Sequence, residues 1–166
     1  MTLLLLAAVI FGQAVELTPS IAVTELSELK LLDQYGDEDS LAAHRGHIVV
    51  VMVVTAKRLR NIKPWEADLR KQVDGVEYLR ITDVPEEPPG DVEQVAEKLR
   101  ERVPDDVPVL IDMERRWATT LGLDTDRPNL LLIDARGRLV ATFRGRYTPQ
   151  LAVDVIEALK KIQGAS

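Results

Sequence analysis

The feature that most constrains the fold is an uninterrupted apolar run, "HIVVVMVVTA", from His47 to Ala56. Most of its residues are β-branched, and the first lysine or arginine after it is Lys57. A strand that is apolar at consecutive positions must be covered on both faces, which is typical of a central strand in a sheet with helices on either side. The run therefore predicts a layered α/β protein.

The rest of the chain alternates between strand and helix patterns. Helical spacing of apolar residues predicts helices over 62–73, 91–103, 113–122 and 148–164, and β-rich runs predict strands over 76–84 and 107–112. "RPNLLLIDARGRLVATFRG" predicts two strands joined by a tight turn at Ala135–Gly137. Alternation implies parallel strands, and the hairpin adds antiparallel ones. We therefore expect a three-layer α/β/α sandwich with a mixed central sheet and an antiparallel edge hairpin.

The segment before the first core strand is more polar. "ELKLLDQYGDEDSLAAHRG", residues 28–46, predicts a short strand, a polar turn around Gly36 and a helical turn capped by Ser40.

The first fourteen residues, "MTLLLLAAVIFGQA", need separate treatment. Residues 3–11 are apolar, and Gly12 and Ala14 stand at positions −3 and −1 of a cleavage site, which is typical of a secretory signal peptide. The run is shorter than the ~20 residues that span a bilayer. We therefore expect a signal peptide at 1–14 and one domain at 15–166, periplasmic or secreted. No Lys or Arg precedes the run, although signal peptides usually carry a basic residue there. Two alternatives therefore stay open: a buried N-terminal strand or helix, or a misassigned start, in which case the protein is cytoplasmic.

Composition limits the chemistry. A net charge of −6 argues against non-specific nucleic-acid binding, which needs a basic surface. The chain has no cysteine, which excludes disulfides, thiolate nucleophiles and Cys-ligated zinc or iron–sulfur clusters. No Gly-rich phosphate loop or HExxH motif is present, and Gly46 separates the two histidines, His44 and His47. We therefore expect no cofactor, no metal site and no catalytic residue.

Three stretches in order, "LLDQYGDEDSLAAHRGHIVVVMVV", "VPVLIDMERRWATTLGL" and "RPNLLLIDARGRLVATFRG", resemble extracytoplasmic thioredoxin-like proteins of the TlpA and peroxiredoxin type. The resemblance runs from about Leu31 to Ile162, most of the chain after residue 14. It implies a thioredoxin-like fold, and it implies that Pro128 is the cis-proline of that family.

One departure from this pattern concerns redox chemistry. Active members of the family carry Cys-x-x-Cys, or a peroxidatic cysteine, at the first strand-to-helix turn. If Pro64 matches the helix proline of that family, the two cysteine positions fall on Ala56 and Leu59; an ungapped match through Gly46 puts them on Arg58 and Asn61 instead. Neither alternative supplies sulfur, and both thiol–disulfide exchange and peroxide reduction require it. The resemblance thus implies the fold without the redox activity.

The same turn is basic. Lys57, Arg58, Arg60 and Lys63 lie where a helix should begin, and helix N-termini bind anions through their amide groups and dipole. The resemblance places Arg127, the residue before Pro128, against the same turn. These side chains are our candidates for binding a carboxylate, a phosphate or an acidic partner segment. A solvated turn without a ligand is the alternative.

These observations predict a redox-inactive domain that binds or positions a protein or peptide partner, such as an acidic one, in the cell envelope. The alternative is an enzyme or binder of a small anionic ligand that uses the basic turn without thiol chemistry. A well-formed apolar pocket beside the turn would favour the small ligand, whereas a flat or filled cleft would favour the partner. The oligomeric state stays open.

Overall fold

The structure is a computed structural model that describes residues 20–85, 90–104 and 106–165. The expected signal peptide at 1–14 lies outside the described residues. Among the helices of the described ranges, none is long and apolar enough to cross a membrane.

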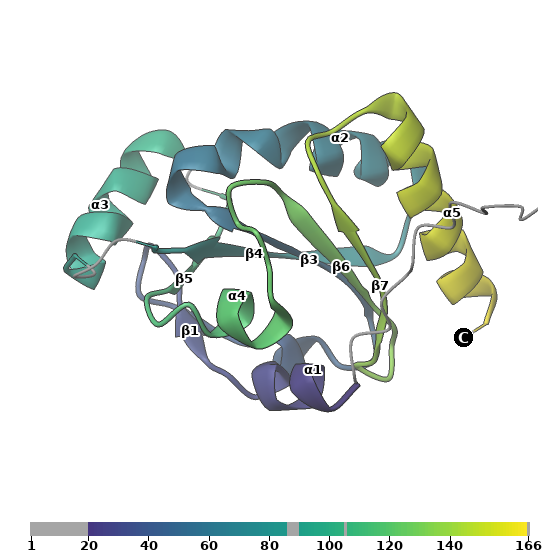
Figure 1. The fold of residues 1–166 in the computed structure, drawn as a ribbon, viewed down its shortest axis with the longest axis horizontal. Coiled ribbons are helices and arrows are strands. Elements are labelled where there is room, and N and C mark those ends of the chain that lie inside the picture. Colours follow the sequence, from purple (N-terminus) through teal and green to yellow (C-terminus); the bar gives the residue numbers. More distant parts are fainter. Residues whose placement is uncertain (1–19, 86–89, 105, 166) are drawn as a thin grey trace, which may run out of the picture.

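A five-stranded mixed sheet with the order β5-β4-β3-β6-β7 forms the middle layer (Figure 1). Strands β3 (Ile48–Thr55), β4 (Val76–Asp83) and β5 (Leu110–Asp112) are parallel. Strands β6 (Asn129–Ile133) and β7 (Leu139–Arg144) are antiparallel and form the predicted hairpin at one edge. The mixed sheet with an antiparallel edge hairpin is confirmed.

The apolar run at residues 47–56 supplies the central strand, β3. All eight of its residues are buried, because helices cover both faces of the sheet. Val49, Val51 and Val53 face one core cluster, and Val50 and Met52 face the other.

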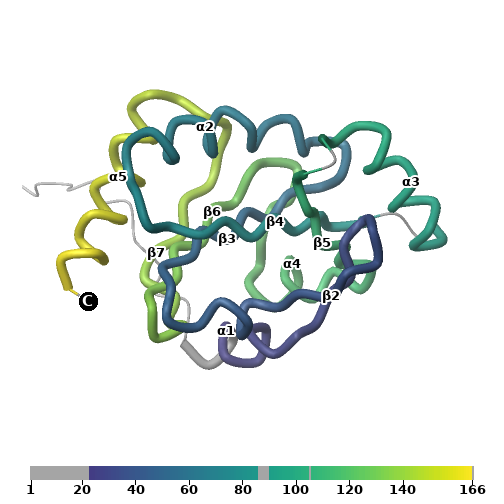
Figure 2. Tube along the Cα trace, turned by 180° about the vertical axis from the view of Figure 1, so that it is seen from behind, coloured from purple at the N-terminus to yellow at the C-terminus, as the bar shows by residue number. Residues whose placement is uncertain are grey.

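The helices make the two outer layers. Helices α2 (Lys63–Gln72), α3 (Val92–Arg102) and α5 (Pro149–Gly164) lie on one face of the sheet, and α1 (Ser20–Ser27) and α4 (Arg116–Leu121) lie on the other (Figures 1 and 2). The α/β/α sandwich that the alternating pattern predicts is therefore present. Helix α1 was not predicted; Val23 and Leu26 of this eight-residue helix are buried in the core cluster that also holds Trp117 and Leu121 of α4.

Polar side chains set two of the predicted helix starts. Asp91 caps α3 by accepting a hydrogen bond from the Glu93 amide at 3.1 Å, and Thr148 caps α5 by accepting one from the Leu151 amide at 3.2 Å. Ser40 precedes the single 3₁₀ turn η1 (Leu41–His44) but makes no side-chain cap. The prediction of a Ser40 cap is wrong, because in this short turn the Ser40 backbone carbonyl accepts from the Ala43 amide instead.

A small hairpin lies beside the main sheet. Strands β1 (Leu31–Leu32) and β2 (Glu38–Asp39) pair antiparallel, and an isolated bridge links Asp33 to Leu110 of β5. The turn contains Gly36 at φ +87°, a conformation that favours glycine. The polar turn predicted around Gly36 is present, and it lies beside the edge of β5.

Candidate functional site

The basic turn after β3 is a 3₁₀ helix, η2 (Ala56–Asn61), rather than the first turn of α2. Helix α2 begins at Lys63, with Ile62 before it and no side-chain cap. Most of the basic side chains thus precede the α-helix instead of crowding its first amides. Leu59 turns inward and packs against the clusters on both sides of η2.

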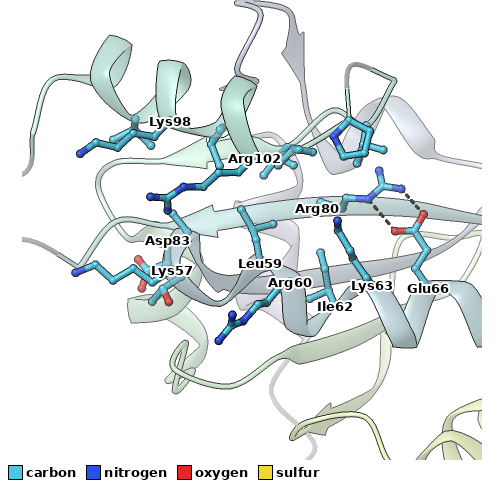
Figure 3. A pocket seen from close by; sticks show the side chains of 18 of the residues that line it. Lys57, Leu59, Arg60, Ile62, Lys63, Glu66, Arg80, Asp83, Lys98 and Arg102 are labelled. Atoms are coloured by element: carbon cyan, nitrogen blue, oxygen red, sulfur yellow. Dashed lines mark hydrogen bonds and ion pairs between the residues drawn. The ribbon is translucent and has the colours of Figure 1, made fainter.

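A cavity of about 990 Å³ opens beside η2 (Figure 3). One wall comes from η2 and α2, the opposite wall from α3, and the floor from β4 and the chain that leads into β5. The apolar side chains that line it are Ala56, Leu59, Ile62, Ala67, Val84, Pro85, Val95, Leu99, Val103, Pro104, Val107 and Val109. The cavity therefore has a largely aliphatic interior.

The charged side chains of the lining are mostly positive. The cations are Lys57, Arg60, Lys63, Arg70, Arg80, Lys98 and Arg102, and the carboxylates are Glu66, Asp83 and Asp126. Seven positive and three negative groups leave a surplus of four positive charges, although the whole chain carries −6. The cavity is thus a local region of positive potential in an acidic protein.

One ion pair is built into the cavity wall. Arg80 of β4 is 8% exposed, and its Nε donates to Glu66 Oε2 at 2.9 Å while its Nη2 donates to Oε1. Arg70 Nε donates to the same carboxylate at 2.8 Å and lies over the Tyr78 ring. Burial acts to raise the pKa of Glu66, but the two guanidinium groups outweigh it and hold the pKa below its ordinary value.

Four of the lining cations stand on the two opposite walls of the cavity. Arg60 and Lys63 come from the η2–α2 side, and Lys98 and Arg102 come from α3 (Figure 3). Within the described residues, none of these four makes an ion pair or side-chain hydrogen bond. Their charges are therefore available to an anion that enters between the two walls.

A cluster of buried polar groups closes the edge of the site. Asp83 ends β4, is 1% exposed, and accepts from Thr125 Oγ1 at 2.5 Å and from Arg115 Nε at 3.1 Å. Its register neighbour Asp112 accepts hydrogen bonds from the amides of Arg116 and Trp117 at the start of α4. Burial raises the pKa of Asp112, and those amide bonds act against the rise. The cluster fixes the loop before β6 to the sheet.

The structure brings together some of the predicted binding residues and separates others. Lys57, Arg60 and Lys63 line the cavity, whereas Arg58 and Arg127 do not. The side chain of Arg127 is 69% exposed and lies 3.9 Å from Asp124. The residue before it in this loop, Asp126, lines the cavity instead.

The positions proposed for the missing cysteines also differ. Ala56 and Leu59 both line the cavity, whereas Arg58 and Asn61 do not. Pro128 is buried, and its carbonyl accepts from the Gly145 amide at 2.9 Å. The cis form of the bond before Pro128 stays a prediction.

Sequence reasoning missed four residues that shape the cavity: Glu66, Arg80, Lys98 and Arg102. Arg80 carried a signal, because it is a charged residue inside the strand pattern "VEYLRITDV" and a buried charge needs a partner. Lys98 and Arg102 carried a weaker one, as like charges spaced i, i+4 on one helix face.

The two histidines lie away from the cavity. His44 contacts Glu77 at 2.6 Å and Asp39 at 3.0 Å, and His47 contacts Glu77 at 3.2 Å. Burial acts to lower the pKa of His44, but the carboxylates outweigh it and raise the pKa. In the part of the chain that the structure describes, no group of three or more acidic or histidine side chains is arranged to hold a metal ion.

Comparison with known proteins rests on structure. No protein-family model and no curated protein matches the sequence. The fold is similar to the pneumococcal exposed lipoprotein thioredoxin Etrx1 of Streptococcus pneumoniae, with TM-score 0.62 and 17% identity over 78% of this chain and 97% of the other.

Two further solved structures show the same likeness. Peroxiredoxin Q of Xanthomonas campestris matches with TM-score 0.60 and 16% identity over 83% of this chain and 94% of the other. BsSco, a member of the Sco family of cytochrome c oxidase assembly proteins, matches with TM-score 0.62 and 13% identity over 83% and 92% of the two chains. The protein therefore has the thioredoxin-like fold, and it has no cysteine with which to perform thiol chemistry.

Proposed function

We propose that this protein is a redox-inactive thioredoxin-like domain that binds an anionic ligand in the cavity beside η2. One observation carries the proposal: a surplus of four positive charges surrounds a cavity in a chain whose net charge is −6. Such a surplus raises the local concentration of anions and orients them on approach.

The shape of the site supports a small ligand more than a flat partner surface. Small-molecule sites are concave, mostly apolar, and about 300–1,000 Å³ in volume. The cavity of about 990 Å³ with its aliphatic interior fits that description. A small anionic ligand is therefore our first candidate, ahead of a protein partner.

Binding without turnover fits the side chains of the cavity. Among the lining residues there is no cysteine, serine or histidine, and the hydroxyl of Thr55 belongs to a buried residue. Of the three lining carboxylates, Asp83 and Glu66 accept hydrogen bonds from the protein at both oxygens, and the third, Asp126, is an exposed residue. Neither of the two buried or half-buried carboxylates, Asp83 and Glu66, is placed as an unoccupied general base.

A protein or peptide partner in the cell envelope is the second candidate. The exposed Arg127 lies next to the lining residue Asp126, so a partner could contact the rim outside the cavity. The expected signal peptide at 1–14 supports an envelope location. Loss of partner binding on Arg58→Ala and Arg127→Ala, with the cavity residues intact, would favour this candidate.

The test of the proposal is the double variant Lys98→Gln/Arg102→Gln, with the fluorescent anion anilinonaphthalene sulfonate as probe. We expect its affinity to fall about tenfold, at roughly 0.7 kcal/mol for each exposed cation, and its salt dependence to flatten.

The matched control is Lys160→Gln/Lys161→Gln on α5, which removes the same charge outside the cavity lining. Unchanged affinity in the α3 variant, or an equal loss in the α5 variant, would contradict the proposal.

A further inference from the structure

Building on the proposed function, we propose that the ligand is a single-chain anionic amphiphile: an aliphatic chain that ends in a carboxylate or phosphate group. The cavity lining has two kinds of side chain, and together they match the two parts of such a molecule.

The composition of the lining is unusually simple. Twelve of its side chains are aliphatic, ten are charged, and one, Thr55, carries a neutral hydroxyl. No aromatic ring and no side-chain amide is among the lining residues. The site therefore offers apolar contact and positive charge, but few directional neutral hydrogen bonds.

This composition argues against other anionic ligands. A nucleotide base gains affinity by stacking on aromatic rings, and its edges need hydrogen-bond partners. A peptide would bury its amide groups against α2 and α3, whose backbone groups are already bonded within each helix, and unpaired buried amides are costly. An inorganic anion would leave the aliphatic interior of the cavity unused. An alkyl chain needs neither rings nor hydrogen bonds.

The arrangement of the side chains is consistent with one orientation of the ligand. Arg60 and Lys63 stand on one wall, Lys98 and Arg102 stand on the opposite wall, and the Leu59 side chain points from η2 toward α3 (Figure 3). An anionic head between the two cationic walls would place the attached chain against the aliphatic residues of α3 and the floor. The buried Arg80 stays neutralised by Glu66 and makes no demand for a second anion there.

Chain length supplies the test, because each buried methylene contributes about 0.8 kcal/mol, or roughly a three- to fourfold gain in affinity. Isothermal titration calorimetry would compare octanoate, decanoate and dodecanoate below their micellar concentrations. Inorganic phosphate, dodecyl phosphate, neutral octyl glucoside and an acidic hexaglutamate peptide would be measured beside them. We expect affinity to rise with chain length, and octanoate to bind more tightly than octyl glucoside.

The cavity variant is Ala67→Phe, which places a ring in the lining from the exposed side of α2. Val95→Phe on α3 is a second variant in case the first does not fold, with folding checked by circular dichroism. We expect either to abolish the dependence on chain length. The matched control, Val153→Phe, adds the same bulk at an exposed apolar position of α5 and should leave it unchanged.

The outcomes separate this inference from the proposed function. Equal affinity for octanoate and dodecanoate, or tighter binding of hexaglutamate than of dodecanoate, would overturn the amphiphile. The proposed anion site would still stand if Lys98→Gln/Arg102→Gln weakened anion binding. Failure of every anion to bind would overturn both. Tighter binding of dodecyl phosphate than dodecanoate, or the reverse, would support the amphiphile and identify its head group.

Discussion

Helix α2 has two flanks on the same face of the sheet, and they differ in packing and in charge. Toward α5, Trp65 is fully buried, donates from its indole nitrogen to the Gly145 carbonyl at 3.3 Å, and meets the Tyr147 ring edge-on at 5.4 Å. Toward α3, the same helix borders a cavity of about 990 Å³ lined by seven cations. One flank is a filled core, and the other is an open charged site.

This contrast separates stability from binding along a single helix. A close-packed interior stabilises the fold because its apolar groups leave water and fill space. An unfilled cavity with like charges on facing walls detracts from stability unless something enters it. We therefore expect substitutions on the side of α2 that faces α5 to change mainly the free energy of unfolding. Substitutions around the cavity on the side that faces α3 should change mainly the affinity for anions.

The largest expected effect is on the packed flank. Trp65→Ala should lower the free energy of unfolding by about 3–5 kcal/mol, because it removes a large buried ring and leaves a cavity. Urea denaturation followed by circular dichroism would measure it. Val95→Ala, at a half-buried position of the cavity lining, is the comparison and should cost about 1 kcal/mol or less. Equal losses at the two positions would break the contrast between the flanks.

An intermediate effect is expected at the boundary, where Glu66 neutralises Arg80. Glu66→Gln should lower the free energy of unfolding by about 3 kcal/mol, because it leaves a nearly buried guanidinium without its carboxylate. Exposed Glu157→Gln on α5 would serve as a control for the loss of one negative charge. A loss in the free energy of unfolding below about 1 kcal/mol would mean that water in the cavity solvates Arg80.

The ion pair between Glu66 and Arg80 should also make the stability difference between the wild type and Glu66→Gln depend on pH. The pKa of Glu66 is lower in the folded protein than in the unfolded chain, so the ion pair contributes fully above the unfolded value of about 4.3 and is lost as the pH falls through the folded value. The gap between the wild type and Glu66→Gln should therefore narrow below about pH 4, in denaturation curves measured from pH 3 to pH 7.

The smallest expected effect on stability is at the cavity itself. Lys98→Gln/Arg102→Gln should change the free energy of unfolding by no more than about 0.5 kcal/mol, with a small gain if relief of like-charge repulsion dominates. The thermal midpoint, measured without added anions, checks this. A loss above about 1 kcal/mol would show that these cations support the fold. It would contradict the division of α2 into a stabilising side and a binding side.

Most helices and strands were predictable because residues close together in the sequence determine them. The β-branched run of β3, the helical spacing of α2 around Trp65 and Leu69, and the cap at Thr148 require no knowledge of distant residues. The thioredoxin-like arrangement followed from their order and from the family resemblance. Helix α1 was missed, because its eight residues make only about two helical turns, which is too short to show a clear period.

The cavity was predictable only on one side. The basic residues of η2 are contiguous in the sequence, so their clustering was visible. Lys98 and Arg102 join them only because β4 and the chain after it place α3 opposite α2. The distance between two helices, and the volume left between them, depend on packing across the sheet and leave no local pattern.

The absence of sulfur from η2 has a consequence for where such a domain can work. In thiol proteins, the state of the turn after the first core strand follows the reduction potential of the compartment. Here that turn carries Ala56 and Leu59, and no oxidant can convert the chain between dithiol and disulfide forms. Occupancy of the cavity would then report ligand concentration and ionic strength alone, with the same response in an oxidising and a reducing compartment.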